Sequence, residues 1–259
     1  MKKYRVCALV SGGKDSCYNA MKCFADGHEL VCLANLHPPP DVDELDSYMY
    51  QSVGANAIEL YSKAMGGLPL YRREIKGAPL KLKEQYEPDM DTDSAGSRDE
   101  VEDLTALLKD VIASEFIDAI SVGAIFSDYQ RVRVENVAER LGLKVLAYLW
   151  HRPQKELLEE MISADIKAIV IKVAAMGLDP VVHLGLTLEE IAPHMTQMNA
   201  KYGLNECGEG GEFESLVLDC PLFTAGRIVI DDAETVIHSA DAFAPVGYLK
   251  LNKMHLEPK

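Results

Sequence analysis

Several common signatures are missing from this 259-residue sequence. It has six cysteines, but none are spaced as CxxC and no histidine pair stands at a metal-ligand spacing. Neither a dedicated zinc site nor a redox dithiol is therefore indicated. No apolar stretch approaches the roughly 18 residues that a membrane-spanning helix needs. The opening MKKYRV leads into a short strand-like run instead of a signal peptide, so we expect a cytoplasmic protein without a membrane partner.

Positive charge is also scarce. Lys and Arg number 26 against 41 Asp and Glu, which gives a net charge of -15. Attraction to a nucleic-acid backbone comes from clustered Lys and Arg, so a nucleic-acid substrate is not expected. The sequence does have apolar residues in abundance, at 48%, which is enough to bury a substantial core in one or two domains.

The first half of the chain alternates strand and helix patterns. Apolar runs predict buried strands at residues 4–10, 30–36, 69–75, 119–125 and 144–150. Helical spacing of apolar residues predicts helices at 17–24, 45–65, 101–112 and 134–141, the second with an interruption near Gly54. Strands separated by helices imply an α/β fold with a doubly wound, mostly parallel sheet.

The rhythm changes after Trp150. The second half predicts a helix near 157–162, a strand at 168–173, a helix from a Thr187–Glu190 capping box to Gly203, and further strands in RIVID and GYLKL. We therefore divide the chain into domains at 1–150 and 151–259, the second a smaller mixed α/β domain. The acidic stretch at 83–103 is interpreted as a solvated surface loop, with a functional lid as the alternative.

SGGKDS, at residues 11–16, follows the first predicted strand and opens the first helix. A Gly-rich turn in that place lets backbone amides approach phosphate oxygens, and the helix N-terminus adds favourable partial charge. The segment is neither a Walker A loop nor a GxGxxG dinucleotide fingerprint. We predict that it binds phosphate, against the simpler interpretation of an ordinary turn. Asn35 ends the second strand at the same expected edge of the sheet.

Residues 123–143 place a strand end, a turn and a helix beside each other, and their polar residues should crowd the same edge. The candidates here are Gly123, Ser127, Asp128, Tyr129, Gln130, Arg131 and Arg133. Arg131 or Arg133 could hold a phosphate or carboxylate through the planar guanidinium. The alternative is that Asp128 caps the helix and the arginines form surface pairs.

ECGEGGEFES, at residues 206–215, concentrates carboxylates around glycines in what we expect to be a flexible turn. Its four acidic residues are Glu206, Glu209, Glu212 and Glu214. Such a cluster repels itself and needs a cation, protons or water. A solvated acidic turn is the alternative to a binding site.

The glycine loop matches the SGGxDS signature of the PP-loop ATP pyrophosphatase superfamily. With DELDSYMYQSVG, GAIFSDYQRVRVENVAERLGL, LAYLW, IKVAAMGLDP and CGEGGEFE, the chain closely resembles the diphthine-ammonia ligase (diphthamide synthetase) family in its short eukaryotic form, almost end to end. The superfamily resemblance implies a PP-loop sheet and ATP cleavage between the α and β phosphates. The family resemblance implies amidation of diphthine, a modified histidine of elongation factor 2, with ammonia, giving AMP and pyrophosphate.

The resemblance also suggests roles for residues. Ser11, Gly12, Gly13, Asp15 and Ser16 would cradle pyrophosphate, Lys14 would offset charge as the leaving group departs, and Mg²⁺ would bridge phosphate oxygens. Gly123, Ser127 and Asn35 would complete the nucleotide site. We assign Lys14, Asp15, Arg131 and Glu209 as catalytic, and Asp128, Tyr129, Glu206, Glu209, Glu212 and Glu214 as substrate-binding.

Diphthine carries a trimethylammonium group, which Glu209, Glu212 or Glu214, with Tyr129 or Phe213, could hold by charge and ring-face attraction. One of these carboxylates could instead deprotonate ammonium, and the residues leave both roles open. No glutaminase signature is present, so free ammonium is the expected donor. Two other functions remain as alternatives: a PP-loop tRNA-modifying enzyme and a nucleotide sensor that docks to a translation factor.

Overall fold

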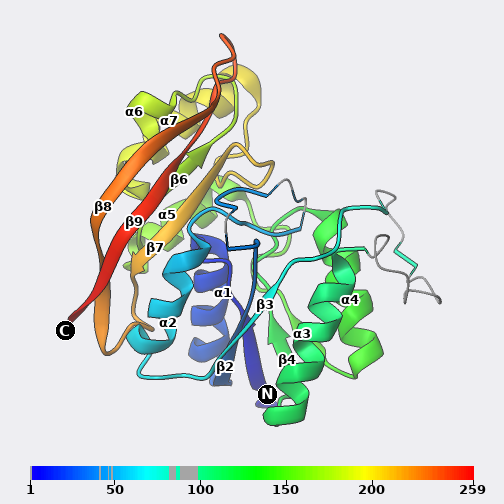
Figure 1. Ribbon diagram of the computed structural model, residues 1–259. Coiled ribbons are helices and arrows are strands. Elements are labelled where there is room, and N and C mark those ends of the chain that lie inside the picture. Colours follow the sequence, from blue (N-terminus) through cyan, green and yellow to red (C-terminus); the bar gives the residue numbers. More distant parts are fainter. Residues whose placement is uncertain (1, 41, 46, 48, 82–85, 88–98) are drawn as a thin grey trace.

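The first sheet is parallel throughout and forms the centre of the N-terminal half (Figure 1). The computed structural model describes residues 2–40, 42–45, 47, 49–81, 86–87 and 99–259. Within them the strand order is β3-β2-β1-β4-β5. These strands are β1 (Arg5–Leu9), β2 (Glu29–His37), β3 (Leu70–Glu74), β4 (Ala119–Ser121) and β5 (Lys144–Leu146). The predicted doubly wound α/β class is confirmed.

Helices cover both faces of this sheet. On one face, α1 (Lys14–Ala25) and α2 (Ile58–Ala64) pack against the side that carries Ala8. On the other, α3 (Val101–Ser114) and α4 (Asp128–Leu141) pack against the side that carries Cys7. Neighbouring strand residues point to opposite faces, so a continuous apolar strand supplies two separate cores.

The strand order reverses beside β1, and this reversal positions the functional site. β1 pairs with β2 on one side and with β4 on the other. The chain leaves β1 toward α1 and leaves β4 toward α4, on opposite faces of the sheet. The carboxyl ends of β1 and β4 therefore open a crevice, which is where ligands bind in open α/β sheets.

The second sheet is smaller and antiparallel, with the order β7-β6-β9-β8. Its strands are β6 (Lys167–Val173), β7 (Phe213–Asp219), β8 (Gly226–Ser239) and β9 (Val246–Pro258), accompanied by α5 (Gln154–Ser163), α6 (Pro180–His183) and α7 (Leu188–Tyr202). Thr187 and Glu190 make the predicted reciprocal capping box, and Gly203 ends α7 in a left-handed conformation.

One apolar core joins the two sheets. Residues of α1 and α2, such as Cys17 and Tyr61, lie in the same cluster as Leu216 of β7 and Phe223. The Tyr61 and Phe223 rings meet edge to face with centroids 4.9 Å apart. In Figure 1, α1 and α2 accordingly lie between the first sheet and the second. The division at residue 150 stays a prediction, since the core continues across it.

The predicted helix at 45–65 is wrong in its first half. Helical structure begins only after Gly54, which has a left-handed φ of 76°, with a 3-10 turn (Ala55–Ala57) that continues into α2. Before it, the Ser47 hydroxyl accepts the amides of Met49 and Tyr50. Serine side chains that hydrogen-bond neighbouring backbone groups compete with helix formation, and the described residues between Leu45 and Gly54 are not helical.

Other differences concern strand ends. The strands predicted at 119–125 and 144–150 stop pairing at Ser121 and Leu146. Of the residues that follow, Val122, Gly123 and Ala124 line the site described below. β7 begins at Phe213, so the end of the predicted acidic turn is a strand. Most of the acidic stretch at 83–103 lies outside the described residues.

Candidate active site

A cavity of about 540 Å³ lies at the carboxyl edge of the first sheet. The acidic loop and the start of β7, which follows it, form a further wall. The volume of the cavity is typical of a small-molecule site. Thirteen of the sequence-predicted residues line it: Ser11, Gly13, Lys14, Asp15, Ser16, Asn35, Gly123, Ser127, Tyr129, Gln130, Glu209, Phe213 and Glu214. The remaining candidates, Gly12, Asp128, Arg131, Arg133, Glu206 and Glu212, do not.

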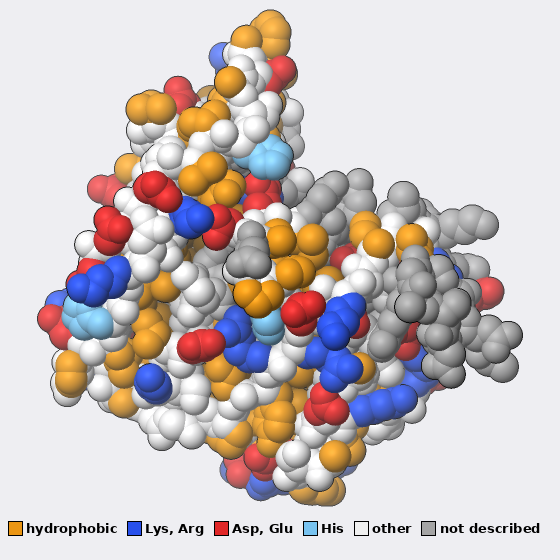
Figure 2. Space-filling view, in the orientation of Figure 1, with side chains coloured by type: hydrophobic (Ala, Val, Ile, Leu, Met, Phe, Trp, Pro, Cys, Tyr) orange, Lys and Arg blue, Asp and Glu red, His pale blue; other side chains and the backbone are white. Residues whose placement is uncertain are grey.

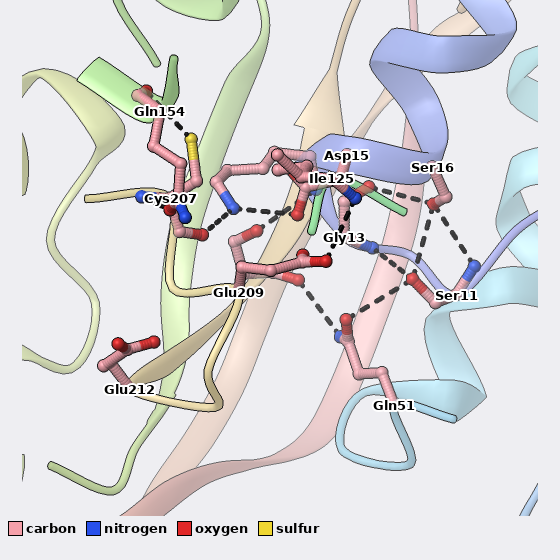
Figure 3. Close-up of polar contacts among 12 residues, drawn as sticks. Ser11, Gly13, Asp15, Ser16, Gln51, Ile125, Gln154, Cys207, Glu209 and Glu212 are labelled. Carbon is pink, nitrogen blue, oxygen red and sulfur yellow. Dashed lines mark hydrogen bonds and ion pairs between the residues drawn. The ribbon is translucent and has the colours of Figure 1, made fainter. Parts of the chain in front are cut away.

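The SGGKDS loop is held in shape by its own serines (Figure 3). The Ser11 hydroxyl accepts the Gly13 amide at 3.2 Å, and the Ser16 hydroxyl donates to the Gly13 carbonyl at 3.0 Å. Gly13 is the N-cap of α1 and offers no capping side chain. The first turn of α1 thus presents its partial positive charge to the cavity.

Gly12 turns the loop from β1 into α1. Its φ of 96° lies in the region that favours glycine. Its carbonyl faces away from the cavity, where it accepts the Tyr61 hydroxyl at 2.8 Å and the Val217 amide at 2.9 Å. Gly12 therefore anchors the SGGKDS loop on the side that faces away from the cavity.

Lys14 and Asp15 form a shielded ion pair at the floor of the cavity. The Lys14 side chain is 2% exposed, and its Nζ lies 2.9 Å from Asp15 Oδ2 and also donates to the Cys207 carbonyl. Burial opposes the charge on Lys14, but Asp15 more than compensates with help from Cys207 and Glu209, so the pKa of Lys14 is raised. Lys14 is consequently a fixed cation at neutral pH.

Asp15 keeps one oxygen without a partner. Its Oδ1 is inaccessible to solvent and makes no hydrogen bond to any described residue. Burial raises the pKa of Asp15, and Lys14 partly offsets that effect. A shielded carboxylate oxygen of this kind calls for a further cation or donor.

Gly123 lets two chain segments touch. A Cβ at this position would lie 2.6 Å from the Ser16 nitrogen and 2.7 Å from the Asp15 carbonyl carbon. The segment after β4 therefore passes directly against the first turn of α1, and only glycine leaves room for it. Gly123 therefore determines how closely the segment after β4 approaches the first turn of α1.

Asn35 ties neighbouring strand ends together. Its Nδ2 donates to the Val10 carbonyl at 2.9 Å, and its Oδ1 accepts from Arg72 Nε at 3.1 Å. It lines the cavity while only 2% exposed. These contacts make Asn35 a brace between strand ends at this edge of the sheet.

The arginines of α4 make internal contacts. Arg131 pairs with Asp128 at 3.0 Å and with Glu135 at 2.7 Å, and it lies over the Trp150 ring. Arg133 is fully buried and stacks 3.3 Å from the centroid of the Tyr129 ring. The structure therefore favours the alternative of protein pairs for both arginines, and neither lines the cavity.

The cap of α4 is Ser127, where the sequence suggested Asp128. The Ser127 hydroxyl accepts the Gln130 amide at 3.3 Å. The Asp128 side chain is 64% exposed and engages Arg131. Asp128 therefore stands outside the cavity, while Ser127 lines it.

Glu209 connects the acidic loop to the end of the first sheet (Figure 3). A single carboxylate oxygen, Oε1, accepts three successive amides, from Ile125, Phe126 and Ser127, at 3.0, 2.9 and 3.1 Å. Charge-assisted bonds to adjacent amides are strong, and they fix the loop against the rim after β4. Glu209 closes one side of the cavity in this way.

Glu206 and Glu212 support the loop from within. Glu206 accepts the Thr196 hydroxyl at 2.9 Å. Glu212 accepts two donors of Asn205 on one oxygen and the Gly210 amide on the other. Both side chains are 8% exposed, so the segment is a folded loop instead of a solvated turn.

Glu214, on β7, faces the cavity within an ion cluster. Lys172 Nζ lies 3.2 Å from its Oε1 and 2.7 Å from Oε1 of Glu44. Burial raises the pKa of Glu214, Lys172 lowers it in opposition, and Glu44 raises it further.

Several residues of the site were not singled out from the sequence. Ser215 accepts the Lys14 amide at 3.1 Å, and Gln51 bridges the Ser11 hydroxyl to the Ser215 carbonyl. Gln154 holds the amide of Cys207, whose carbonyl receives Lys14. Gln51 lies in a motif that carried the family resemblance, but nothing in the sequence indicates that β7 caps α1.

Two family models match nearly the whole chain. The diphthamide synthase N-terminal domain matches residues 4–145, and the diphthamide synthase C-terminal domain matches residues 153–254. The chain belongs to the diphthamide synthase family. The first model contains the SGGKDS loop and Gly123, and the second contains the acidic loop, so the cavity combines residues of both.

Similar members of the diphthamide synthase family extend from mammals to yeast. The chain is 59% identical to the rat protein named diphthine--ammonia ligase, over 98% of this chain and 93% of the relative. The human protein of the same name is 58% identical with the same coverage. A fission yeast protein of that name, from Schizosaccharomyces pombe, is 48% identical over 95% of this chain but only 39% of its own length.

Proposed function

We propose that this chain amidates a protein-bound carboxylate with ammonia, using ATP and passing through an acyl-adenylate. The substrate is the diphthine of elongation factor 2, and the products are diphthamide, AMP and pyrophosphate. Relatives named diphthine--ammonia ligase and the match to diphthamide synthase models support the reaction class. A carboxylate is a poor electrophile toward ammonia, and adenylation bonds one of its oxygens to the α phosphorus, so that AMP becomes the leaving group in place of oxide.

The observation that carries the proposal is the SGGKDS loop at the floor of a shared cavity. Its amides, the first turn of α1 and the buried cation of Lys14 suit the β and γ phosphates of ATP. With the outer phosphates held there, the α phosphorus faces the open cavity and the incoming acid. Fixed charges that need no reorganisation are well suited to stabilise departing pyrophosphate.

The residues also fit a magnesium ion. Asp15 Oδ1 is shielded from solvent and has no hydrogen-bond partner among the described residues, and carboxylate oxygen is a preferred ligand of Mg²⁺. Asp15 would hold the ion together with phosphate oxygens, and bound magnesium would neutralise phosphate charge. Burial raises the pKa of Asp15, and the charge of Lys14, 2.9 Å from Oδ2, partly offsets that rise.

The cavity also offers groups that suit a modified histidine with a fixed positive charge. The carboxylate of Glu209 and the rings of Tyr129 and Phe213 line the same cavity. A trimethylammonium group has no N–H donor, so it is bound by ring faces and by carboxylate charge across an apolar contact. We place the diphthine side chain here, with its carboxylate toward the α phosphorus.

The surface is consistent with a protein substrate. Figure 2 shows acidic and basic side chains interspersed over one face, without a continuous basic stripe in the described residues of that view. Phosphate-backbone recognition depends on such stripes, so a tRNA substrate gains no support from this face.

No helix of the described ranges has the length and apolarity to cross a membrane.

The reaction can be tested with purified protein, ATP, magnesium, ammonium and elongation factor 2 bearing diphthine. We expect AMP and pyrophosphate in a one-to-one ratio with amide, detected as the small mass decrease from acid to amide. Lys14→Met keeps the chain length of the side chain but removes its charge, and should lower kcat by about a hundredfold or more. Thermal unfolding of the variant checks that its fold is retained.

Two results would contradict the proposal. Release of ADP in place of AMP would show that ATP is cleaved between its β and γ phosphates, whereas the proposal requires cleavage between α and β. Nucleotide binding without any turnover in the presence of unamidated factor would favour the nucleotide sensor.

A further inference from the structure

The four glutamates of residues 206–215 have different environments, and these separate their roles. Glu206 and Glu212 are hydrogen-bonded inside the loop and do not line the cavity. Glu209 lines it, but its Oε1 is already engaged by three amides. Glu214 also lines the cavity, and its Oε2 makes no hydrogen bond to any described residue.

Glu214 is held in place from the neighbouring strand. Glu214 on β7 and Lys172 on β6 are register partners, and Lys172 Nζ lies 3.2 Å from Glu214 Oε1. The same Nζ lies 2.7 Å from Glu44, whose second oxygen lies 3.0 Å from His238 Nδ1. Two carboxylates thus share one lysine, and the three side chains are only 14–21% exposed. This cluster has capacity for one further cation.

Glu214 Oε2, which is shielded from solvent and has no hydrogen-bond partner among the described residues, matches the needs of the second half-reaction. Ammonia is present in water at neutral pH almost entirely as ammonium, which has no lone pair and cannot attack a carbonyl. A site for this reaction must therefore attract ammonium and remove one proton. Glu214 supplies negative charge and an acceptor oxygen, and burial raises its pKa, which makes it a stronger base than a solvated glutamate.

We infer that Glu214 binds ammonium in the cavity and accepts its proton, releasing ammonia to attack the acyl-adenylate. This inference rests on the proposed function and assigns a catalytic residue to it. The N–H electron pair stays on nitrogen as the proton passes to Glu214. That pair then forms the C–N bond, the bond from the acyl carbon to the AMP oxygen breaks, and the second proton leaves the new amine to solvent. Lys172 and Glu44 are positioning residues that orient the carboxylate.

Exchange of the nucleophile tests this role. Hydroxylamine is a weaker base than ammonia and is largely neutral at pH 7.5, so it can attack the acyl-adenylate without a protein base. For Glu214→Gln we expect kcat/KM for ammonium to fall by about a hundredfold or more, the usual scale for loss of a general base. The rate of hydroxamate formation from hydroxylamine should stay within about threefold of the unsubstituted protein, because adenylation is intact.

Two further variants keep the outcome interpretable. Glu214→Asp retains a carboxylate and should recover part of the ammonium activity that the glutamine variant loses. Glu102→Gln is the matched control, because Glu102 is similarly buried and ion-paired, to Arg140 at 2.9 Å, but does not line the cavity. It should leave the ratio of ammonium to hydroxylamine activity unchanged.

Three results would overturn the inference. Glu214→Gln could retain full ammonium activity, or lose both nucleophiles equally with an unchanged KM for the factor, which would indicate a role in adenylation or folding. It could instead raise the KM for the factor with both nucleophiles, which would assign Glu214 to the trimethylammonium group. If the unsubstituted protein gives AMP with neither nucleophile, the proposed function itself fails.

Discussion

At the scale of single residues, the site depends on side chains that hold backbone in place as much as on groups that would touch substrate. Glu209 gathers three amides, Asn35 braces two strand ends, and Gly123 allows a close approach that any side chain would prevent. Such roles follow from distances between segments remote in sequence. The family resemblance suggested ligand contacts at all three positions.

Gly123 gives the sharpest test at this scale. Gly123→Ala would place a Cβ 2.6 Å from the Ser16 nitrogen, so the rim after β4 and the first turn of α1 must separate. Overpacking of this kind costs about 1–3 kcal/mol, and if that cost falls on the nucleotide-bound form, KM for ATP rises by roughly 5- to 100-fold. Steady-state kinetics with varied ATP measure the change.

Gly142→Ala is the control for a general loss of stability. Gly142 caps the end of α4 with a left-handed φ of 69°, and a Cβ there would meet nothing within 4 Å. The substitution should cost about 1 kcal/mol of stability through backbone strain and leave KM for ATP unchanged. An equal effect of the two variants on KM would show that the close approach at Gly123 is unimportant.

At the scale of elements, the sequence predicted those whose periodicity and caps are local. The parallel strands, α3, α4 and α7 have apolar stripes or terminating glycines that can be identified without a structure. The segment at 45–54 and β7 could not be predicted in the same way. Serine hydrogen bonds determine the first, and pairing with a strand about 45 residues earlier determines the second.

The same limit applies to the candidate site. The glycine loop and the acidic loop were both identified, since each has an unusual local composition. Their meeting through Lys14, Cys207 and Ser215 was not, because those contacts join residues about 200 positions apart. Arg131 and Asp128 pair with each other on α4 and lie outside the cavity, and their assigned roles stay predictions.

The N-terminal end of α3 contains an acid whose ionisation should affect stability. Glu100 is fully buried, its Oε2 accepts the Ser47 hydroxyl at 2.7 Å, and its Oε1 has no hydrogen-bond partner among the described residues. Burial raises the pKa of Glu100 from 4.5 to about 7, Ser47 opposes this, Asp99 and Asp103 add to it, and Arg133 lowers it. Folding therefore favours the protonated form.

The sign of the pH dependence follows from this pKa. The folded-state value lies above that of an unfolded glutamate, so the folded protein holds the proton more tightly, and the free energy of unfolding falls as pH rises from 4.5 to about 7. Each unit between the two pKa values contributes about 1.4 kcal/mol, or roughly 3 kcal/mol over the interval. Above pH 7 the contribution of Glu100 to the free energy of unfolding no longer changes with pH.

Glu100→Gln isolates this contribution, because glutamine keeps the shape of the side chain and cannot ionise. Urea unfolding at several pH values should show that the variant gains stability relative to the unsubstituted protein as pH rises from 5 to 7. Parallel stability curves for the two proteins would mean that Glu100 is not protonated in the fold.

At the scale of the whole molecule, the two sheets act as one folded unit around the cavity. β7 caps α1 through Ser215, and the Val217 amide supports the Gly12 carbonyl behind the phosphate loop. The apolar core that begins on α1 and α2 is completed by Leu216 and Phe223. The N-terminal half therefore contains the predicted phosphate-binding sequence but not all of the contacts that shape it.

A chain ending at residue 150 tests how far the proposed domains are independent. Removing the second sheet would expose the face of α1 and α2 that now packs against it, at about 25 cal/mol for each Å² of apolar surface. It would also remove Ser215 from the Lys14 amide and the Cys207 carbonyl from Lys14 Nζ. We expect residues 1–150 to lack a cooperative thermal transition and to bind ATP at least tenfold more weakly than the full chain, as measured by calorimetry.

Co-expression with residues 151–259 should restore both properties, because the missing contacts are non-covalent. If the fragment alone melts cooperatively and binds ATP with the affinity of the full chain, the phosphate site is complete without β7, and the cap from Ser215 is dispensable.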